Sequence, residues 1–92
     1  MVDQLVEELL GLTINKKRIV KYAYIKSESI TSLDVKRDLK IEEGKAREFL
    51  YDLYKIGILH RDFRETKPYI GLYSISELYK KAVTFVIETN RI

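Results

Sequence analysis

The sequence contains no cysteine and no tryptophan, and it has a single histidine, a single proline and a single methionine. The lack of cysteine excludes a disulfide framework and a zinc ribbon. One histidine does not make a metal site alone, and we expect neither a metal ion nor a cofactor. No apolar run approaches the roughly 18 residues that a membrane span needs. The first residues, VDQLVEELL, are acidic and unlike a signal peptide, so we expect a cytoplasmic protein.

The composition is that of a small folded protein. Hydrophobic residues make up 46% of the 92 residues and charged residues 34%, which predicts one domain over 1–92 with a core that dimerisation would enlarge. Lysine and isoleucine are abundant, which is typical of proteins from heat-loving archaea or their viruses.

The net charge of +3 is unevenly distributed along the chain. Residues 1–14 carry three acids and no base, and residues 15–26 carry five bases and no acid. The bases are Lys16, Lys17, Arg18, Lys21 and Lys26. This basic block has two interpretations, a surface that faces phosphates or a solvated helix face.

Apolar spacing predicts helices over 2–10, 16–26, 33–40, 42–56 and 77–89. Asn15, Ser32 and Ser76 are the expected helix caps. The third helix is expected to bury Leu33, Val35 and Leu39, and the fourth to bury Ala46, Leu50, Leu53 and Tyr54. Ile30 predicts a very short strand or extended link, and Gly57 is expected to end the fourth helix.

Two strands are expected after the fourth helix. Residues 58–63 form the first and YIGLYSI the second, with Tyr73 and Ile75 in the core. RETKP, which holds the only proline, is the loop between them. The order of elements predicts an α+β fold of the winged helix-turn-helix type: a three-helix core plus a two-stranded wing, with flanking N- and C-terminal helices. The helix-turn-helix is expected over 30–56, the wing over 58–75 and the last helix over 76–89.

Two segments resemble that superfamily closely. ITSLDVKRDLKIEEGKAREFLYDLYKIGIL resembles a capped helix, an apolar turn residue and a recognition helix that ends at a glycine, and HRDFRETKPYIGLYSI resembles a wing hairpin. The chain is similar to small archaeal and archaeal-virus regulators and, more loosely, to the MarR and PadR repressors. This resemblance implies a nucleoid-associated regulator of transcription that binds double-stranded DNA as a homodimer, with the helix after the wing building the dimer.

A second resemblance implies a different function. The stretch from Ile30 through the second wing strand is also similar to the winged helix of archaeal transcription factor E, alpha subunit, which acts through RNA polymerase and promoter DNA. The chain departs from that family because it has no tryptophan in the wing and no zinc ribbon. This alternative implies a protein partner.

The sequence offers no arrangement typical of an enzyme. It contains no HExxH, GxSxG, P-loop or GxGxxG pattern. His60 stands alone beside Arg61 and Asp62, and a surface histidine is the simpler interpretation. We therefore expect a binding protein.

A winged helix presents its recognition helix to the major groove and its wing to the minor groove or backbone. Helix 42–56 and wing 61–68 take these roles. The expected DNA-binding residues are Lys36, Arg37, Lys45, Arg47, Tyr51, Arg61, Arg64 and Lys67. Arg47 suits a bidentate contact to guanine, and Arg64 and Lys67 suit the minor groove.

Several residues of this surface keep two interpretations. Gly44 either admits close approach of a DNA backbone or has a packing role, and Tyr51 either contacts DNA or packs under the wing. Glu43 and Glu48 either accept from cytosine amino groups or form helix ion pairs, for example Glu48 with Lys45.

The last helix has two expected apolar faces. One comprises Leu78, Ala82, Phe85 and Val86, and the other comprises Tyr79, Val83 and Ile87. One face packs on the domain, and the second needs a partner, which a symmetry mate would provide. The alternative is a monomer in which the two terminal helices cover each other.

Overall fold

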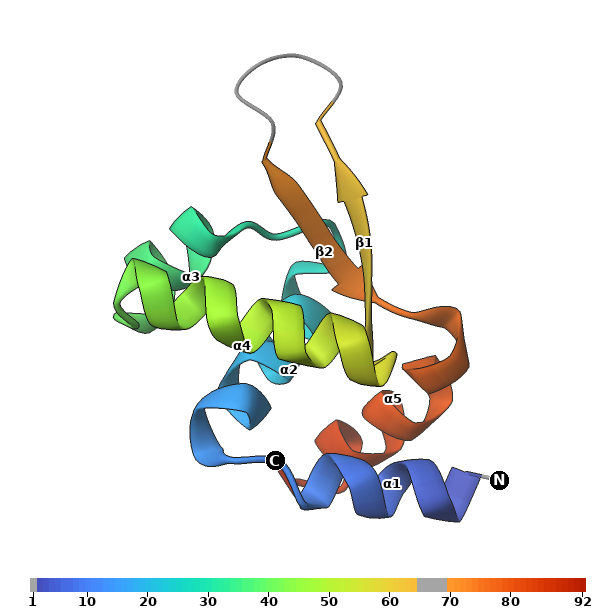
Figure 1. Cartoon of the computed structure of the whole chain (residues 1–92). Coiled ribbons are helices and arrows are strands. Elements are labelled where there is room, and N and C mark those ends of the chain that lie inside the picture. The colour runs from blue at the N-terminus through green and yellow to red at the C-terminus, as the bar shows by residue number, and fades with distance from the viewer. Residues whose placement is uncertain (1, 65–69) are drawn as a thin grey trace.

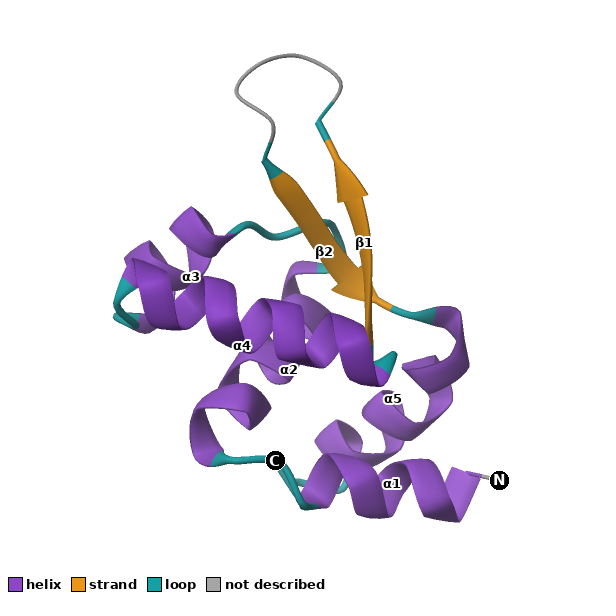
Figure 2. Ribbon diagram, in the orientation of Figure 1, coloured by secondary structure: helices purple, strands orange, loops and turns teal. Residues whose placement is uncertain are grey.

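The computed structural model describes residues 2–64 and 70–92, and only the backbone of residues 2 and 3. The elements, in chain order, are α1 (Val2–Leu10), α2 (Ile14–Lys26), α3 (Ser32–Leu39), α4 (Glu43–Ile56), β1 (Leu59–Phe63), β2 (Gly71–Ile75), the 3₁₀ turn η1 (Glu77–Tyr79) and α5 (Lys80–Glu88). The helices pack together and the two strands project from them as a hairpin (Figure 1, Figure 2).

The core takes apolar side chains from nearly every element. The largest side chains with almost no exposed surface are Leu9, Ile19, Ile30, Leu50, Leu53, Ile58 and Leu59. In α4 the buried residues are Ala46, Leu50 and Leu53, which recur at a spacing of three to four and so occupy one face of the helix. Burial of this face fixes which side of α4 is left for solvent.

The two strands are antiparallel, with Leu59 opposite Ile75 and Phe63 opposite Gly71. Ile30 extends the sheet by one residue, because its backbone N–H donates to Tyr73 O at 2.8 Å and its carbonyl accepts from Tyr73 N at 2.9 Å. This isolated bridge confirms the very short strand expected there. It also ties the start of the helix-turn-helix to the base of the wing.

The expected caps were wrong at α2 and α3, and in the last helical segment Ser76 holds the expected N-cap position without a capping hydrogen bond from its side chain. Thr31, not Ser32, caps α3: its hydroxyl accepts from Asp34 N at 3.2 Å while the Asp34 carboxylate accepts from Thr31 N at 3.0 Å. This reciprocal pair is a capping box, which needs an acidic residue three positions after the cap. Ser32 lacks that partner, because Val35 follows it at that spacing.

The starts of α2 and α5 also differ from expectation. Helix α2 begins at Ile14, two residues earlier than expected, with Thr13 at the N-cap position but without a side-chain capping hydrogen bond. Asn15 lies inside the helix and accepts from Arg18. Ser76 precedes a 3₁₀ turn, and its hydroxyl donates to Gly57 O at 2.6 Å instead of capping α5. Ser76 therefore joins the last helix to the end of α4.

Two residues expected in the core are exposed. Leu33 is 50% exposed because it lies in the first turn of α3, and Tyr54 is 37% exposed because it lies on the edge of α4 beside the wing. Val35 and Tyr73 are buried as expected, and Leu39 and Ile75 pack against the core while partly exposed.

The last helix divides its apolar residues differently from the expected faces. Tyr79, Ala82, Val83 and Val86 are all buried, whereas Leu78 and Phe85 are 68% and 43% exposed. Helix α1 packs against α5 along the bottom of the molecule (Figure 1). The Tyr79 hydroxyl donates to Glu8 Oε2 at 2.6 Å across this contact. The terminal helices thus cover each other, while Leu78 and Phe85 stay outside the contact.

Candidate nucleic-acid interface

The candidate interface is formed by α3, the turn after it, α4 and the wing strands. Lys40 takes a left-handed conformation at φ 59°, and Ile41 buries its side chain in the turn. This turn lets α4 cross in front of α2 with one face buried (Figure 1). The opposite face of α4 points to solvent with the hairpin rising beside it.

The first turn of α4 is capped by its own carboxylate. Glu42 accepts from Gly44 N at 2.8 Å and from Lys45 N at 3.2 Å. These two amides lower the pKa of Glu42, so the cap keeps its charge at neutral pH and loses its stabilising effect only as the pH falls through that lowered pKa. A Cβ added at Gly44 would lie 3.1 Å from Glu42 Oε1. The structure thus gives Gly44 a packing role, because it makes room for the capping carboxylate.

The two basic residues predicted for the groove both have acidic partners on α4. Arg47 Nη2 lies 2.5 Å from Glu43 Oε2 and Lys45 Nζ lies 3.4 Å from Glu48 Oε2. The Lys45–Glu48 pair is one that the sequence predicted. Exposed pairs at this spacing contribute only about 0.3–0.5 kcal/mol, whereas a good bidentate contact to a base is worth about 1–3 kcal/mol. Either base-reading contact would therefore outweigh the pair that it opens.

On α3, Arg37 belongs to an acidic network. Its guanidinium lies 3.2 Å from Asp34 Oδ1 and 2.9 Å from Asp38 Oδ1, and Tyr22 of α2 donates to the same Asp38. Arg37 and Tyr22 together hold the pKa of Asp38 well below its usual range, and Asp38 in turn raises the pKa of Arg37. Burial and Asp38 raise the pKa of Tyr22 to about 12. Arg37 thus helps to tie α3 to α2, while its neighbour Lys36 is exposed.

In the wing, Arg61 is surrounded by aromatic rings. Its guanidinium carbon lies 4.2 Å from the ring centroid of Tyr54, 4.9 Å from that of Phe63 and 5.5 Å from that of Tyr51. Cation–π contacts of this kind favour a fixed side chain. Arg61 is therefore placed to hold β1 against α4. The sequence did not indicate this role, because Tyr54 was expected to be buried in the core.

Of the two remaining predicted wing residues, the structure describes Arg64 but not Lys67. The backbone N–H of Arg64 donates to Ile70 O at 3.1 Å, which extends the hairpin by one pair, and the Arg64 side chain is exposed. Lys67 and most of RETKP lie outside the described residues. The role expected of Lys67 in the minor groove stays a prediction.

A groove of about 390 Å³ separates α4 from the wing. Arg47 and Tyr51 line it from α4, Ser32 from α3, and Phe63 and Tyr73 from the strands. Tyr51 is exposed, with Lys55 over its ring at 5.6 Å. The groove thus brings together Arg47 and Tyr51, two of the predicted residues, next to the wing.

The basic block on α2 is largely used inside the fold. Arg18 Nη2 donates to Leu39 O at 2.6 Å, where it satisfies a carbonyl at the end of α3. Lys16 lies 3.3 Å from Asp52 of α4, and Lys26 lies 4.0 Å from Asp38 of α3. Neither sequence interpretation anticipated that these side chains join three helices.

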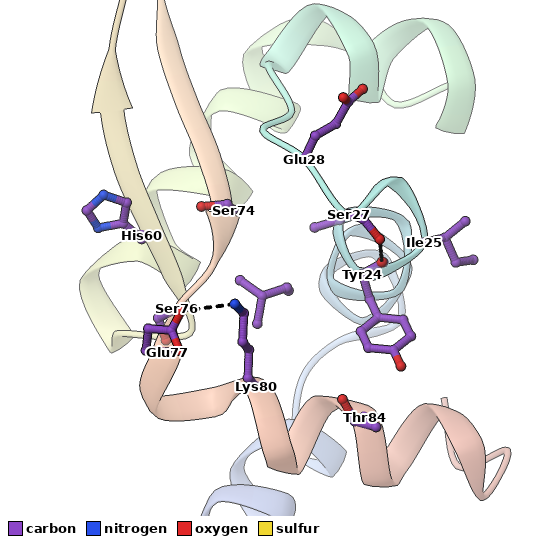
Figure 3. A pocket seen from close by; sticks show the side chains of 12 residues that line it. Tyr24, Ile25, Ser27, Glu28, His60, Ser74, Ser76, Glu77, Lys80 and Thr84 are labelled. Atoms are coloured by element: carbon purple, nitrogen blue, oxygen red, sulfur yellow. Dashed lines mark hydrogen bonds and ion pairs between the residues drawn. The ribbon is translucent and has the colours of Figure 1, made fainter.

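A larger pocket of about 870 Å³ lies on the other side of the wing. It is lined by His60 of β1, whereas Arg61, the next residue, faces α4, as the alternation of a strand requires. Figure 3 shows Tyr24 and Ile25 of α2 across the pocket from His60, with Lys80 between them reaching toward Glu77. Lys80 Nζ lies 2.9 Å from Glu77 Oε1, so this pocket holds an internal ion pair of its own.

Within residues 2–64 and 70–92, no group of three or more histidine, aspartate or glutamate side chains is placed to hold a metal ion. None of the helices described is both long and apolar enough to cross a membrane.

A helix-turn-helix followed by a two-stranded hairpin defines the winged-helix class, and solved structures agree with that assignment. No protein-family model matches the sequence, and no curated protein matches it. A "Possible transcriptional regulator" from Methanosarcina mazei is 16% identical, with a TM-score of 0.71 over 96% of this chain and 78% of that one. The adhesin competence repressor AdcR from Streptococcus pyogenes is 17% identical, with a TM-score of 0.71 over 95% of this chain and 63% of its own.

A mutant of MepR from a multidrug-resistant S. aureus isolate is 16% identical, with a TM-score of 0.70 over 98% of this chain and 68% of that one. At these identities the similarity establishes the winged-helix fold. The chain spans between about 63% and 78% of the length of the three structures.

Proposed function

We propose that this chain is a transcriptional regulator that binds double-stranded DNA, with α4 in the major groove and the wing on the minor groove or backbone. The observation that carries the proposal is the groove between α4 and the wing, where Arg47 and Tyr51 meet the wing strands. One of the similar structures is named a possible transcriptional regulator and another is named a repressor, and these two names support the same function.

The proposed contacts use side chains of α3, α4 and the wing together with Lys67, which lies outside the described residues. Lys45, Arg47 and Tyr51 face the bases and their edges, whereas Lys36, Arg37, Arg61, Arg64 and Lys67 face the phosphates or the minor groove. Because Arg37 and Arg47 have acidic partners, the phosphate attraction comes mainly from Lys36, Arg64 and Lys67. Binding is therefore salt-dependent.

The test is fluorescence anisotropy with a random duplex between about 50 and 200 mM salt. Arg47→Ala and Arg64→Ala are expected to weaken binding several-fold. Arg91→Ala is the control, because Arg91 lies over Phe85 near the C-terminus, away from α4. Equal affinity of all three variants and the wild type would reject the proposed surface, and no binding at low salt would reject DNA as the ligand.

A homodimer is the second part of the proposal. Leu78 and Phe85 are seven residues apart, so they lie on the same side of the last helix, and both are exposed. A second copy that covers them would present two recognition helices to a palindromic site. Sedimentation equilibrium of the wild type and of Leu78→Glu/Phe85→Glu tests this: a dimer that the double substitution disrupts supports it, and a wild-type monomer rejects it.

A protein-binding winged helix, similar to transcription factor E, is the other candidate. The exposed rings of Tyr51, Tyr54 and Phe63 gather around Arg61, and such a cluster also suits a protein partner. Failure of the wild type to bind duplex DNA would favour this function.

A further inference from the structure

Glu43 and Arg47 stand side by side on the exposed part of α4. The spacing of four residues places them one turn apart, with Glu43 Oε2 2.5 Å from Arg47 Nη2. Both line the groove beside the wing. The Arg47 side chain is 70% exposed and that of Glu43 is 29% exposed. An acceptor and a donor thus lie next to each other at the surface that the proposed function places in the major groove.

The edge of a C·G base pair has the complementary arrangement. In the major groove, cytosine presents its N4 amino group as a donor, next to the O6 and N7 acceptors of guanine. A carboxylate beside a guanidinium offers the matching acceptor and donors in the same order.

We propose that Glu43 and Arg47 act as one reading pair for a C·G base pair, Glu43 accepting from cytosine N4 and Arg47 donating to guanine. This inference rests on the proposed function, since it concerns the same face of α4. It makes Glu43 a specificity-determining residue, and it joins the two interpretations that the sequence left open for Glu43, an ion pair and an acceptor for cytosine.

The first turn of α4 supports a role in discrimination. The backbone N–H groups of Gly44 and Lys45 in this turn donate to the Glu42 carboxylate. A DNA phosphate at this helix end would therefore meet two carboxylates, Glu42 and Glu43, in place of free N–H donors. Approach to a phosphate is unfavourable here, whereas approach to a cytosine amino group satisfies Glu43. The turn thus disfavours nonspecific contact.

The test begins with selection of bound duplexes from a randomised library by the wild-type protein. Affinity is then measured by anisotropy for the selected duplex and for duplexes in which each C·G pair is replaced in turn by T·A. The wild type is expected to lose roughly tenfold in affinity at one C·G position. Glu43→Gln is expected to reduce that loss to about two- or threefold, because an amide accepts less strongly and adds a competing donor.

Glu48→Gln is the matched control. It removes the same charge from the same helix, where Glu48 pairs with Lys45. Both substitutions are expected to tighten binding to random duplex by removing a negative charge, and only Glu43→Gln is expected to lower the C·G preference. Arg47→Ala is expected to lower it as well.

Three results would overturn the inference. A wild type that binds duplexes without preference for C·G at any position contradicts the reading pair but leaves DNA binding intact. If Glu43→Gln keeps the full preference for C·G, the ion pair between Glu43 and Arg47 serves only the stability of the helix. Absence of any duplex binding by the wild type rejects the proposed function itself, and the reading pair with it.

Discussion

At the scale of single residues, a side chain that packs in the core and also forms a hydrogen bond helps to specify which helices meet. Tyr79 is 3% exposed, and its hydroxyl donates to Glu8 Oε2 while its ring lies in the core. A buried polar group that loses its partner is costly, so such contacts also specify which helices meet. Tyr79 therefore adds a hydrogen bond to the apolar contact between α1 and α5.

Tyr79→Phe removes this hydrogen bond and keeps the ring. We expect a loss of about 1 kcal/mol in the free energy of unfolding, measured by urea denaturation at neutral pH. Tyr24→Phe is the control, because the Tyr24 ring is partly exposed at the rim of the larger pocket. Equal stability of Tyr79→Phe and the wild type would show that the hydroxyl contributes nothing.

The same residue predicts a dependence on alkaline pH. Burial and the Glu8 carboxylate raise the pKa of Tyr79 from 10.0 to about 12, because both disfavour the phenolate. A raised pKa in the folded state gives a stabilisation that is complete below the unfolded value and is lost as the pH rises through the folded one. The difference in stability between wild type and Tyr79→Phe is therefore expected to shrink between about pH 10 and pH 12.

The residue scale also shows where sequence reasoning succeeded and failed for the site. The pairing of Lys45 with Glu48 follows from their spacing, and it was predicted. The same rule, applied at a spacing of four, would have found Glu43 with Arg47. The ring cluster around Arg61 could not have been found, because it depends on how closely β1 approaches α4, which no local pattern determines.

At the scale of elements, helix ends determine the geometry of the helix-turn-helix. Helix α3 starts with the capping box of Thr31 and Asp34, and it ends where Arg18 donates to Leu39 O. Helix α4 starts at the Glu42 cap and ends at Gly57, whose φ of 99° suits glycine. The start and end of each helix are therefore fixed by specific side chains.

Two single substitutions test which residue caps α3. Thr31→Ala is expected to lower the free energy of unfolding by about 1 kcal/mol, since it removes the hydroxyl that accepts from Asp34 N. Ser32→Ala is expected to change it much less, because Ser32 is already the first residue of the helix. Chemical denaturation of both variants measures the difference, and a larger effect at Ser32 would contradict the capping box.

Most elements were predictable because their apolar spacing is strong. The α4 stripe of Ala46, Leu50 and Leu53 is buried, and YIGLYSI contains the predicted strand with Tyr73 buried, because each pattern belongs to a single element. The caps were harder, since Thr31 and Ser32 are adjacent and both are good caps. The choice between them depends on Asp34, whose carboxylate completes the box only with Thr31.

At the scale of the whole molecule, the charges of α2 illustrate what sequence could not reveal. A run of five bases suggests an exposed basic surface, but Lys16, Arg18 and Lys26 contact α3 and α4. These contacts join residues far apart in the chain, so they follow from the fold and not from local pattern. The radius of gyration of 12.6 Å is close to the roughly 12 Å expected for a compact chain of this length.

The terminal helices show the same point for assembly. Sequence assigned Leu78 and Phe85 to one face with Ala82 and Val86, whereas the structure buries the latter two and exposes the former two. The buried residues Tyr79, Ala82, Val83 and Val86 recur at the i, i+3, i+4 and i+7 spacing of a single helical face, whereas the expected faces divided them between two. The exposed pair is the surface on which the proposed dimer depends.

The central claim is that the face formed by α4 and the wing binds duplex DNA. Its most direct test is a titration of the ¹⁵N-labelled protein with a short random duplex at about 50 mM salt, followed by amide chemical shifts. We predict that the shifts concentrate on α4, on the start of α3 and on β1, with α1 and α5 little changed. Shifts confined to α1, α5 or the larger pocket, or no shifts at all, would contradict the claim.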